Sequence, residues 1–433
     1  MRVKHVQFAI DRCLGRRSIS CIATAPPRFP RPAISAPGSW RDHRCPGSDA
    51  ILQRSVRSVV PRAAASDPPA TPPALPLCER AATAQCKLVD LVKLYRTCQD
   101  TIQAVGSSWE QADDGPGFAE LALELEWLFE DAVAEVVADN STSERFQRIA
   151  RLGQGWKAIR QAIDGVDDDS LLPSTKLRLR MGIDEIAALW RRRVETREPF
   201  QYLTSSAFWR DVVLAVGPGV LIPRPETELM IDYATEAVSE NPGLTSLPWA
   251  DLGTGSGALA IALARLLGTG SVVHAVDVST AAVEYTTLNA SRLLGPRTGT
   301  VSAVQAPWFE GLAELRGQLG GVLSNPPYIP RKNLAGLQAE VRDFEPRLAL
   351  DGGDGAGMDS LEVICRGAAE YLAPGGFLAL ETDGDAQAAM VAELLRELRD
   401  DTGAPAFVAV EIRRDYRDVG RFVTASRASK RAS

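Results

Sequence analysis

The chain has 433 residues, of which 45% are hydrophobic, so it can bury a substantial core and more than one domain. It carries 48 basic and 55 acidic residues, for a formal net charge of −7. No apolar run approaches the ~18 residues that a membrane-spanning helix needs, so we expect no membrane partner.

The first 63 residues differ in composition from the rest of the chain. They hold twelve Lys or Arg residues and only three acidic residues, with many Ser, Ala and Pro. This composition is typical of an organellar transit peptide, and a disordered basic arm that binds nucleic acid is the alternative. The leader lacks a clear amphipathic Arg helix, and residues 59–65 resemble a stromal processing site. We therefore expect a chloroplast (plastid stroma) location, with the mitochondrion as alternative, and a disordered linker over 64–76.

The charge of the remaining chain bears on its partners. Removing the twelve basic and three acidic residues of the leader leaves 36 basic and 52 acidic ones, a net charge of −16. Such an acidic protein is a poor binder of phosphates, so we expect a protein substrate and no stable nucleic-acid binding. Outside the leader, His274 is the only histidine and no cysteine pair has C-x-x-C spacing. We therefore expect no metal site.

Apolar residues recur at three- and four-residue spacing over 77–196, which predicts a helical domain. Its clearest stripe consists of Phe118, Leu121, Leu125, Leu128, Phe129, Val133 and Val136. A later helix ends in Arg191, Arg192 and Arg193, interpreted as a solvated helix end that is favourable against the dipole. In the linker over 197–230, apolar residues alternate around Gly217-Pro218-Gly219, which predicts a β-hairpin at 211–222.

From residue 231 to 433 predicted strands alternate with helices, which is typical of a mostly parallel sheet covered on both faces. The strands are expected at about 247–252, 271–277, 300–304, 320–324, 376–381, 405–412 and 419–425. The last two are joined by a short polar segment, so we expect them to be antiparallel. The predicted fold class is therefore α/β, a Rossmann-like seven-stranded sheet preceded by a helical domain.

A glycine-rich turn from Gly253 to Gly257 separates the first of these strands from a predicted helix. Its glycines let the backbone approach a ligand, and the helix N-terminus offers free N–H groups. Asp277 ends the second strand, where a carboxylate would hold ribose hydroxyls. A dinucleotide dehydrogenase fits this pattern as well as a methyltransferase does, since Gly253, Gly255 and Ala258 satisfy G-x-G-x-x-A.

The loop Asn325-Pro326-Pro327-Tyr328 distinguishes between these two classes. Two consecutive prolines stiffen the turn, which can aim the Asn325 side-chain oxygen and the Pro326 carbonyl at one point. Two acceptors beside an aromatic ring suit an NH2 group, which an amino methyltransferase must grip and a nicotinamide enzyme need not. The alternative for Asn325 is that it merely caps a proline-rich turn, and the alternative for Tyr328 is ordinary packing against Ile329.

The glycine-rich turn, Asp277 and Ser324-Asn325-Pro326-Pro327-Tyr328 together resemble the class I S-adenosylmethionine-dependent methyltransferases that act on planar nitrogen. The segments at 199–203, 221–228 and 340–350 narrow the resemblance to the release-factor glutamine methyltransferases (the PrmC/HemK family). Relatives that act on a ribosomal protein usually carry Ser where this chain has Pro225. The resemblance covers roughly residues 199–425 and extends more loosely back to about 77.

The resemblance implies S-adenosyl-L-methionine as cofactor and assigns roles to the motif residues. The implied cofactor-binding residues are Gly253, Thr254, Gly255, Ser256, Gly257, Asp277, Trp308 and Asn325. The implied catalytic residues are Asn325, Pro326 and Tyr328, and the substrate-binding residues are Asn325, Pro326, Pro327 and Tyr328. Trp308 matches an adenine-flanking aromatic, but Pro307 replaces the family's acidic residue beside it. Asp251 either reaches the cofactor's amino group through water or caps the turn.

The implied activity is methylation of the glutamine side-chain amide in the Gly-Gly-Gln motif of an organellar peptide chain release factor. The helical domain at 77–196 would help to dock that substrate. The residues by themselves indicate only methylation of a planar amino group. The alternatives are a nucleic-acid adenine amino methyltransferase, a methyltransferase of another protein glutamine, and a degenerate methyltransferase fold that acts as a binding scaffold.

Overall fold

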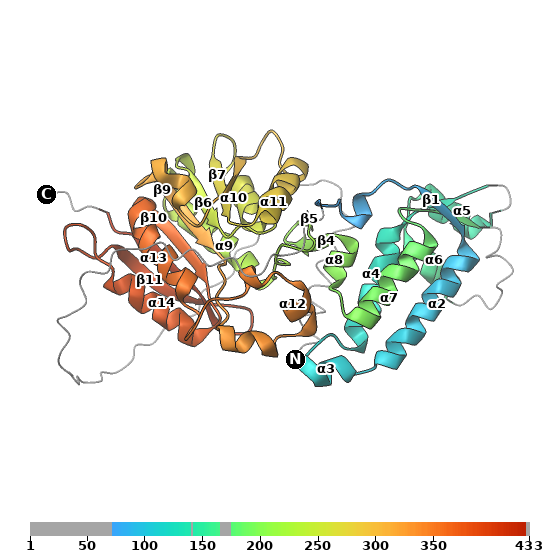
Figure 1. Cartoon of the computed structure of the whole chain (residues 1–433). Coiled ribbons are helices and arrows are strands. Elements are labelled where there is room, and N and C mark those ends of the chain that lie inside the picture. Colours follow the sequence, from blue (N-terminus) through green and yellow to red (C-terminus); the bar gives the residue numbers. More distant parts are fainter. Residues whose placement is uncertain (1–71, 140–141, 165–174, 430–433) are drawn as a thin grey trace, which may run out of the picture. The chain divides into compact units, whose positions relative to one another are not determined.

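The computed structural model describes residues 72–139, 142–164 and 175–429 (Figure 1). The expected transit peptide (1–63) and most of the expected linker (64–76) lie outside the described residues. In the described part, helices come first along the chain, a short hairpin follows, and an alternating α/β part comes last.

The first part combines helices with a small sheet that the sequence analysis did not predict. Its elements are η1 (Leu77–Glu79), β1 (Ala84–Lys87), α2 (Leu88–Val105), α3 (Ser108–Asp113), α4 (Phe118–Ala132), β2 (Val133–Val137), α5 (Glu144–Arg151), α6 (Trp156–Ile163), β3 (Lys176–Leu179), α7 (Ile183–Thr196) and α8 (Phe200–Thr204). The strands pair antiparallel in the order β1-β3-β2. The sequence pattern missed β2 because Val133 and Val136 continue the apolar spacing of α4.

Aromatic side chains hold these helices together. Tyr95 on α2, Phe129 on α4 and Trp156 on α6 have ring centroids 5.0 to 5.2 Å apart. Phe129 and Trp156 are fully buried. Since aromatic pairs at this spacing add to the free energy gained by burying their area, this trio anchors the helical core.

The basic end of α7 corrects one prediction. Arg193 is not solvated, because its side chain is only 1% exposed and forms ion pairs with Glu124 on α4 and Glu340. Arg192, its neighbour, is 52% exposed and matches the predicted solvated end. Helical periodicity explains the difference, because one residue further along α7 turns the side chain by about 100° towards the interior.

The predicted hairpin exists, but it lies earlier in the chain than 211–222. Strands β4 (Ser206–Trp209) and β5 (Val212–Ala215) pair antiparallel, and Trp209 lies opposite Val212. The turn is therefore Arg210-Asp211, and Arg210 has a positive φ of 49°. Gly217-Pro218-Gly219 follows β5 as a separate turn. The prediction placed the hairpin too late in the chain because it took this turn for the hairpin turn.

The last part is built on a seven-stranded sheet in the order β11-β12-β10-β9-β6-β7-β8. Its strands are β6 (Trp249–Leu252), β7 (Val272–Asp277), β8 (Thr300–Gln305), β9 (Leu319–Ser324), β10 (Leu372–Glu381), β11 (Phe407–Arg414) and β12 (Gly420–Arg427). The strands from β6 to β10 pair in parallel, whereas β12 is antiparallel to both β10 and β11. The predicted seven strands and the antiparallel final pair are confirmed.

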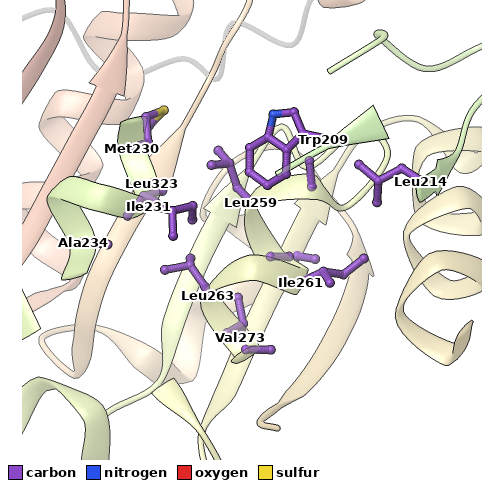
Figure 2. Packing of buried hydrophobic residues seen from close by; sticks show 14 of the residues in the cluster. Trp209, Leu214, Met230, Ile231, Ala234, Leu259, Ile261, Leu263, Val273 and Leu323 are labelled. Carbon is purple, nitrogen blue, oxygen red and sulfur yellow. The ribbon is translucent and has the colours of Figure 1, made fainter. Parts of the chain in front are cut away.

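Helices cover both faces of this sheet. They are α9 (Leu229–Glu240), α10 (Ala258–Leu267), α11 (Thr280–Leu293), α13 (Asp359–Tyr371) and α14 (Asp385–Glu397), with the short α12 (Ala339–Phe344) after β9. Successive strand residues alternate between the two faces. On β9, Leu323 packs among residues of α9 and α10, as Figure 2 shows, while Val322 belongs to the cluster around α13 and α14.

No helix in the described ranges has the length and apolar character that crossing a membrane requires.

Candidate active site

The carboxyl ends of β6, β7, β9 and β10 meet at one edge of the sheet because these neighbouring strands are parallel. These strands end at Leu252, Asp277, Ser324 and Glu381. The Ser324 hydroxyl donates a hydrogen bond of 2.6 Å to the Leu252 carbonyl and so ties the ends of β9 and β6 together. The loops that carry the predicted motifs therefore start side by side, where open α/β sheets bind their ligands.

The glycine-rich turn between β6 and α10 requires glycine at several positions. Gly253, Gly255 and Gly257 have φ values of +74°, +56° and +84°, a region that residues with a Cβ rarely adopt. A Cβ at Gly255 would meet open space, so the backbone here is accessible to a ligand. A Cβ at Gly257 would lie 3.1 to 3.2 Å from Thr286 on α11, so this glycine serves the packing of α10 against α11.

The other two residues of the turn have structural partners. The Thr254 hydroxyl donates a hydrogen bond of 2.7 Å to Asp251, and the Ser256 carbonyl accepts one of 2.9 Å from Asn289. Both residues are buried. The Thr254 side chain therefore supports the turn through Asp251, whereas Ser256 is held through its backbone carbonyl.

Asp251 caps the turn and the helix that follows it. Its Oδ2 accepts hydrogen bonds from the Thr254 hydroxyl and, at 3.0 Å, from the Ala260 backbone N–H in the first turn of α10. Burial raises the pKa of Asp251 to about 7, although both hydrogen bonds act to lower it. Its Oδ1 is buried and, within the described chain, has no hydrogen-bond partner. Asp251 therefore performs the predicted cap and still offers one acceptor to a ligand.

Asp277 lies beside the same turn. Its Oδ2 accepts a hydrogen bond of 3.0 Å from Gly255 N–H, and its Oδ1 accepts one of 2.9 Å from Ser279 N–H. Burial raises the pKa of this carboxyl, while the backbone hydrogen bonds counteract that rise. The structure brings Asp277 and Gly255 together, as the sequence predicted.

Trp308 approaches the glycine-rich turn from the loop after β8. Its ring lies 3.7 Å from the position of a Cβ at Gly253. Its φ of +47° is in the left-handed region, which is uncommon for a large side chain and indicates local backbone strain. The indole is thus held next to the turn, where the sequence analysis expected an adenine-flanking aromatic.

Asn325 begins the loop after β9, and its side chain has a defined partner. Its Nδ2 donates a hydrogen bond of 3.2 Å to the hydroxyl of Thr227, a buried residue just before α9. In the described chain, neither Asn325 Oδ1 nor the carbonyl of the buried Pro326 accepts a hydrogen bond. The two acceptors that the sequence analysis singled out are therefore available to a ligand.

Tyr328 is held by polar contacts at both its side chain and its backbone. Its hydroxyl donates a hydrogen bond of 3.1 Å to Glu381 Oε1 at the end of β10. Its carbonyl accepts one of 2.9 Å from Gln387 Nε2 on α14. Tyr328 also packs against the cluster around α13 and α14, so it is fixed in place rather than merely resting on Ile329. Pro327 lies half-buried between these anchored residues.

Sequence reasoning missed three residues that support this loop, namely Thr227, Glu381 and Gln387. Glu381 is 1% exposed, and burial raises its pKa to about 7. The one usable signal was its position, because an acidic residue that ends a buried parallel strand falls at the ligand-binding edge. Thr227 lies in the segment 221–228 that contributes to the family resemblance, but nothing there indicates a hydrogen bond to Asn325, and nothing in the local sequence pattern marks Gln387.

No group of three or more His, Cys, Asp or Glu side chains in the described residues could hold a metal ion.

The matching family model and the curated relatives point to one class of enzyme. The family model described as "Methyltransferase small domain" matches residues 228–341. The release factor glutamine methyltransferase of Synechocystis sp. is 41% identical over 273 residues, which cover 63% of this chain and 87% of the relative. That of Thermosynechococcus vestitus is 41% identical over 254 residues, covering 58% and 81%. A solved methyltransferase from Pyrococcus furiosus is 15% identical with a TM-score of 0.34, covering 50% of this chain and 89% of that one.

Proposed function

The chain belongs to the release factor glutamine methyltransferases, and we propose that it methylates the glutamine side-chain amide in the Gly-Gly-Gln motif of an organellar peptide chain release factor. It is an S-adenosylmethionine-dependent protein-glutamine methyltransferase. The observation that carries the proposal is the 41% identity that extends over 87% of the Synechocystis enzyme. The organellar substrate goes beyond that similarity and rests on the composition of the leader.

The residues at the carboxyl edge fit S-adenosylmethionine. A side chain at Gly255 would stand in open space, so the backbone can approach the methionine part of the cofactor. The buried Asp251 Oδ1, which has no hydrogen-bond partner among the described residues, is an acceptor suited to an ammonium group. Asp277 would hold the ribose hydroxyls, and Trp308 would lie against the adenine.

Pro307 leaves the adenine edge without the acidic partner that is usual in the family. We expect this to weaken cofactor binding by about the value of one hydrogen bond, ~1 kcal/mol, without abolishing activity.

The chain's own residues would orient the substrate nitrogen. When bound, the cofactor supplies a methyl group that is strongly activated by a sulfonium. A glutamine amide is a weak nucleophile, so its geometry matters most. Asn325 Oδ1 and the Pro326 carbonyl would accept the two amide hydrogens and stabilise the positive charge that develops on nitrogen. Tyr328 would wall the pocket alongside. The methylated nitrogen is acidic enough to lose its proton to water, so no residue need act as a general base.

The composition of the leader supports an organellar substrate. The first 63 residues hold twelve basic and three acidic residues, a composition typical of transit peptides. We propose a plastid location, with the mitochondrion as alternative. A fluorescent fusion of residues 1–76 should label chloroplasts, and labelling of mitochondria alone would contradict this.

A methyl-transfer assay with the full chain and labelled S-adenosylmethionine tests the substrate. The assay compares an organellar release factor, its Gln→Ala variant in the Gly-Gly-Gln motif, another glutamine-containing protein and DNA. We expect label on the release factor alone, lost both with that variant and with the Asn325→Ala enzyme.

Each other outcome would replace the proposal with a defined alternative. Label on DNA alone would indicate an adenine amino methyltransferase, although the acidic charge outside the leader argues against it. Label on another protein's glutamine would change the substrate and keep the chemistry. Saturable cofactor binding without any transfer would favour a binding scaffold.

A further inference from the structure

We propose that Thr227 and Glu381 are positioning residues that fix which end of the Asn325 side-chain amide faces the candidate active site. The inference deepens the proposed function and rests on it only for its catalytic consequence. It assigns a role to the second oxygen of a buried carboxylate, Glu381 Oε2, which bonds Thr227 while Oε1 accepts the Tyr328 hydroxyl.

The three residues form a continuous hydrogen-bonded relay. Asn325 Nδ2 lies 3.2 Å from Thr227 Oγ1, and Thr227 Oγ1 lies 2.7 Å from Glu381 Oε2. Thr227 is 4% exposed and Glu381 is 1% exposed. Asn325 lies 98 positions after Thr227 in the sequence, and Glu381 lies 154 positions after it. The relay therefore joins the segment before α9 to the ends of β9 and β10.

The ionised carboxylate sets the direction of the whole relay. A carboxylate can only accept hydrogen bonds, so the Thr227 hydroxyl must point its one hydrogen at Glu381. The hydroxyl then presents only lone pairs to Asn325, and a lone pair attracts the NH2 end of the amide. The amide oxygen is consequently turned away from Thr227. This is the orientation in which Asn325 offers an acceptor to a substrate NH2 group.

The same carboxylate orders the other end of the loop. Glu381 Oε1 accepts the Tyr328 hydroxyl hydrogen at 3.1 Å, while Oε2 reaches Asn325 through the Thr227 hydroxyl. One carboxylate therefore supports both ends of the Asn325–Tyr328 loop. Because the diproline turn is stiff and is held at both ends, the Asn325 side-chain amide has little freedom to rotate.

The charges around Glu381 determine how it titrates. Arg421 on β12 favours its ionised form, whereas Glu226 near the start of α9 opposes it, and Thr227 and Tyr328 donate hydrogen bonds to it. Arg421 is itself paired with Asp415 at 2.8 Å. The net effect of burial and these groups is a pKa of about 7. A protonated Glu381 can donate to Thr227, which frees the hydroxyl to donate to Asn325 and removes the preference for one amide orientation.

The direct test observes the Asn325 amide in the full chain without cofactor or substrate. In protein labelled with ¹⁵N-asparagine, the Asn325 NH2 resonances are assigned by their loss in Asn325→Asp. We expect these resonances to shift with pH, with a midpoint near 7, in the wild-type chain. Glu381→Gln and Thr227→Val should abolish that transition, whereas Thr227→Ser should retain it. Resonances that titrate unchanged in Thr227→Val, or that have the same shifts at pH 8 in the wild type, Glu381→Gln and Thr227→Val, would overturn the proposal.

The kinetic test measures kcat and KM for the release factor in the same variants. We expect Thr227→Val to lower kcat tenfold or more with KM changed less than threefold, and Thr227→Ser to restore most of the activity. Equal kcat in Thr227→Val and the wild type would overturn the catalytic role.

Thr382→Val is the matched control for both tests. Thr382 is the next residue after Glu381, is fully buried, and donates a hydroxyl hydrogen bond of 3.0 Å to the Arg421 carbonyl, outside the relay. It should keep both the titration and the kcat of the wild type, and a tenfold loss in this variant would indicate a merely structural effect. The resonance test needs no substrate, so it decides the inference even if the wild type fails to label a release factor, which would overturn the proposed function instead.

Discussion

Asn325 is the residue on which the proposed transfer depends most directly. Its side-chain oxygen accepts no hydrogen bond from the residues that the structure describes, so it is an acceptor placed before the substrate arrives. Removing one such group typically costs about 3–4 kcal/mol in transition-state stabilisation. We therefore predict that Asn325→Ala lowers kcat on the order of 10²- to 10³-fold. Steady-state kinetics measures the loss. Thermal unfolding provides the control, because a folded protein that keeps more than a tenth of its activity would contradict this role.

The raised pKa of Asp251 predicts how the free energy of unfolding changes with pH. Its pKa is raised by burial from 3.8 to about 7, so between these values the folded state binds a proton more tightly than the unfolded state does. The contribution of Asp251 to stability is therefore largest at low pH and is lost as the pH rises through about 7. Relative to the wild type, Asp251→Asn should become progressively more stable from pH 5 to pH 8, by on the order of a few kcal/mol.

Urea unfolding of both proteins across this range measures the difference. Burial lowers the pKa of His274, which acts in the opposite direction, but His274 is present in both proteins and cancels. Asp400→Asn is the control, because hydrogen bonding to Thr402 holds the pKa of this exposed carboxyl below its usual range. The free-energy difference between Asp400→Asn and the wild type should stay constant from pH 5 to pH 8. A similarly constant difference for Asp251→Asn would show that Asp251 does not titrate in this window.

At the scale of elements, two glycines of the glycine-rich turn have different roles: Gly257 serves the packing of α10 against α11, and Gly255 serves cofactor binding. Gly257→Ala places a methyl group 3.1 to 3.2 Å from side-chain and backbone atoms of Thr286, so α10 and α11 must move apart. Gly255→Ala meets open space and carries only the strain of a positive φ, about 1–2 kcal/mol. We predict that Gly257→Ala is clearly the less stable variant, and that Gly255→Ala stays folded but binds S-adenosylmethionine at least tenfold more weakly.

Thermal unfolding and calorimetric titration of the two glycine variants test this separation. Gly153→Ala is a useful reference for the cost of a positive φ, because Gly153 has a φ of +59° and open space around it, and it lies between α5 and α6 in the helical part of the chain. Wild-type affinity in Gly255→Ala would show that the open space beside this glycine is not occupied by the cofactor.

The elements that the sequence predicted well are those with a strong periodic signal. The sheet strands from β6 to β12 were placed within a few residues, because buried parallel strands appear as short apolar runs between helices. The hairpin was misplaced because its turn, Arg210-Asp211, lacks glycine or asparagine, while the nearby Gly217-Pro218-Gly219 carries the usual turn signal. Strand β3 was missed because its four residues are too few to establish an alternation.

At the scale of the whole molecule, the candidate site was only partly predictable. The residues that approach a ligand, such as Gly255, Asp277 and Asn325, lie in contiguous motifs whose spacing carries meaning. The residues that hold them, such as Thr227 and Glu381, come from segments up to 154 positions apart. One sequence does not reveal which distant hydroxyl meets which buried carboxylate, because that pairing depends on the register of the strands and the packing of the helices.

Arg193 tests the same principle for stability, since a buried charge depends on partners from distant segments. Its side chain is 1% exposed and pairs at 2.6 Å with Glu124 and at 3.1 Å with Glu340. If the Arg193 charge is removed, Glu340 keeps a second partner in Arg197, but Glu124 loses its ion pair. Burial already raises the pKa of Glu124, so its ionised form would be costly without Arg193. We predict that Arg193→Met lowers the free energy of unfolding by about 3–5 kcal/mol, the usual cost of breaking a buried ion pair from one side.

The matched control is Arg192→Met, one residue earlier on α7. Arg192 is 52% exposed and pairs with Glu198, so its loss should cost at most ~1 kcal/mol. Urea unfolding measures both variants, and equal losses would contradict the buried role of Arg193. If the cost arises from the unpaired Glu124, then adding Glu124→Leu to Arg193→Met should recover most of it, because removing both charges avoids their desolvation. A double variant that is no more stable than Arg193→Met alone would instead assign the loss to side-chain packing around Trp109, whose ring centroid lies 5.1 Å from the Arg193 guanidinium.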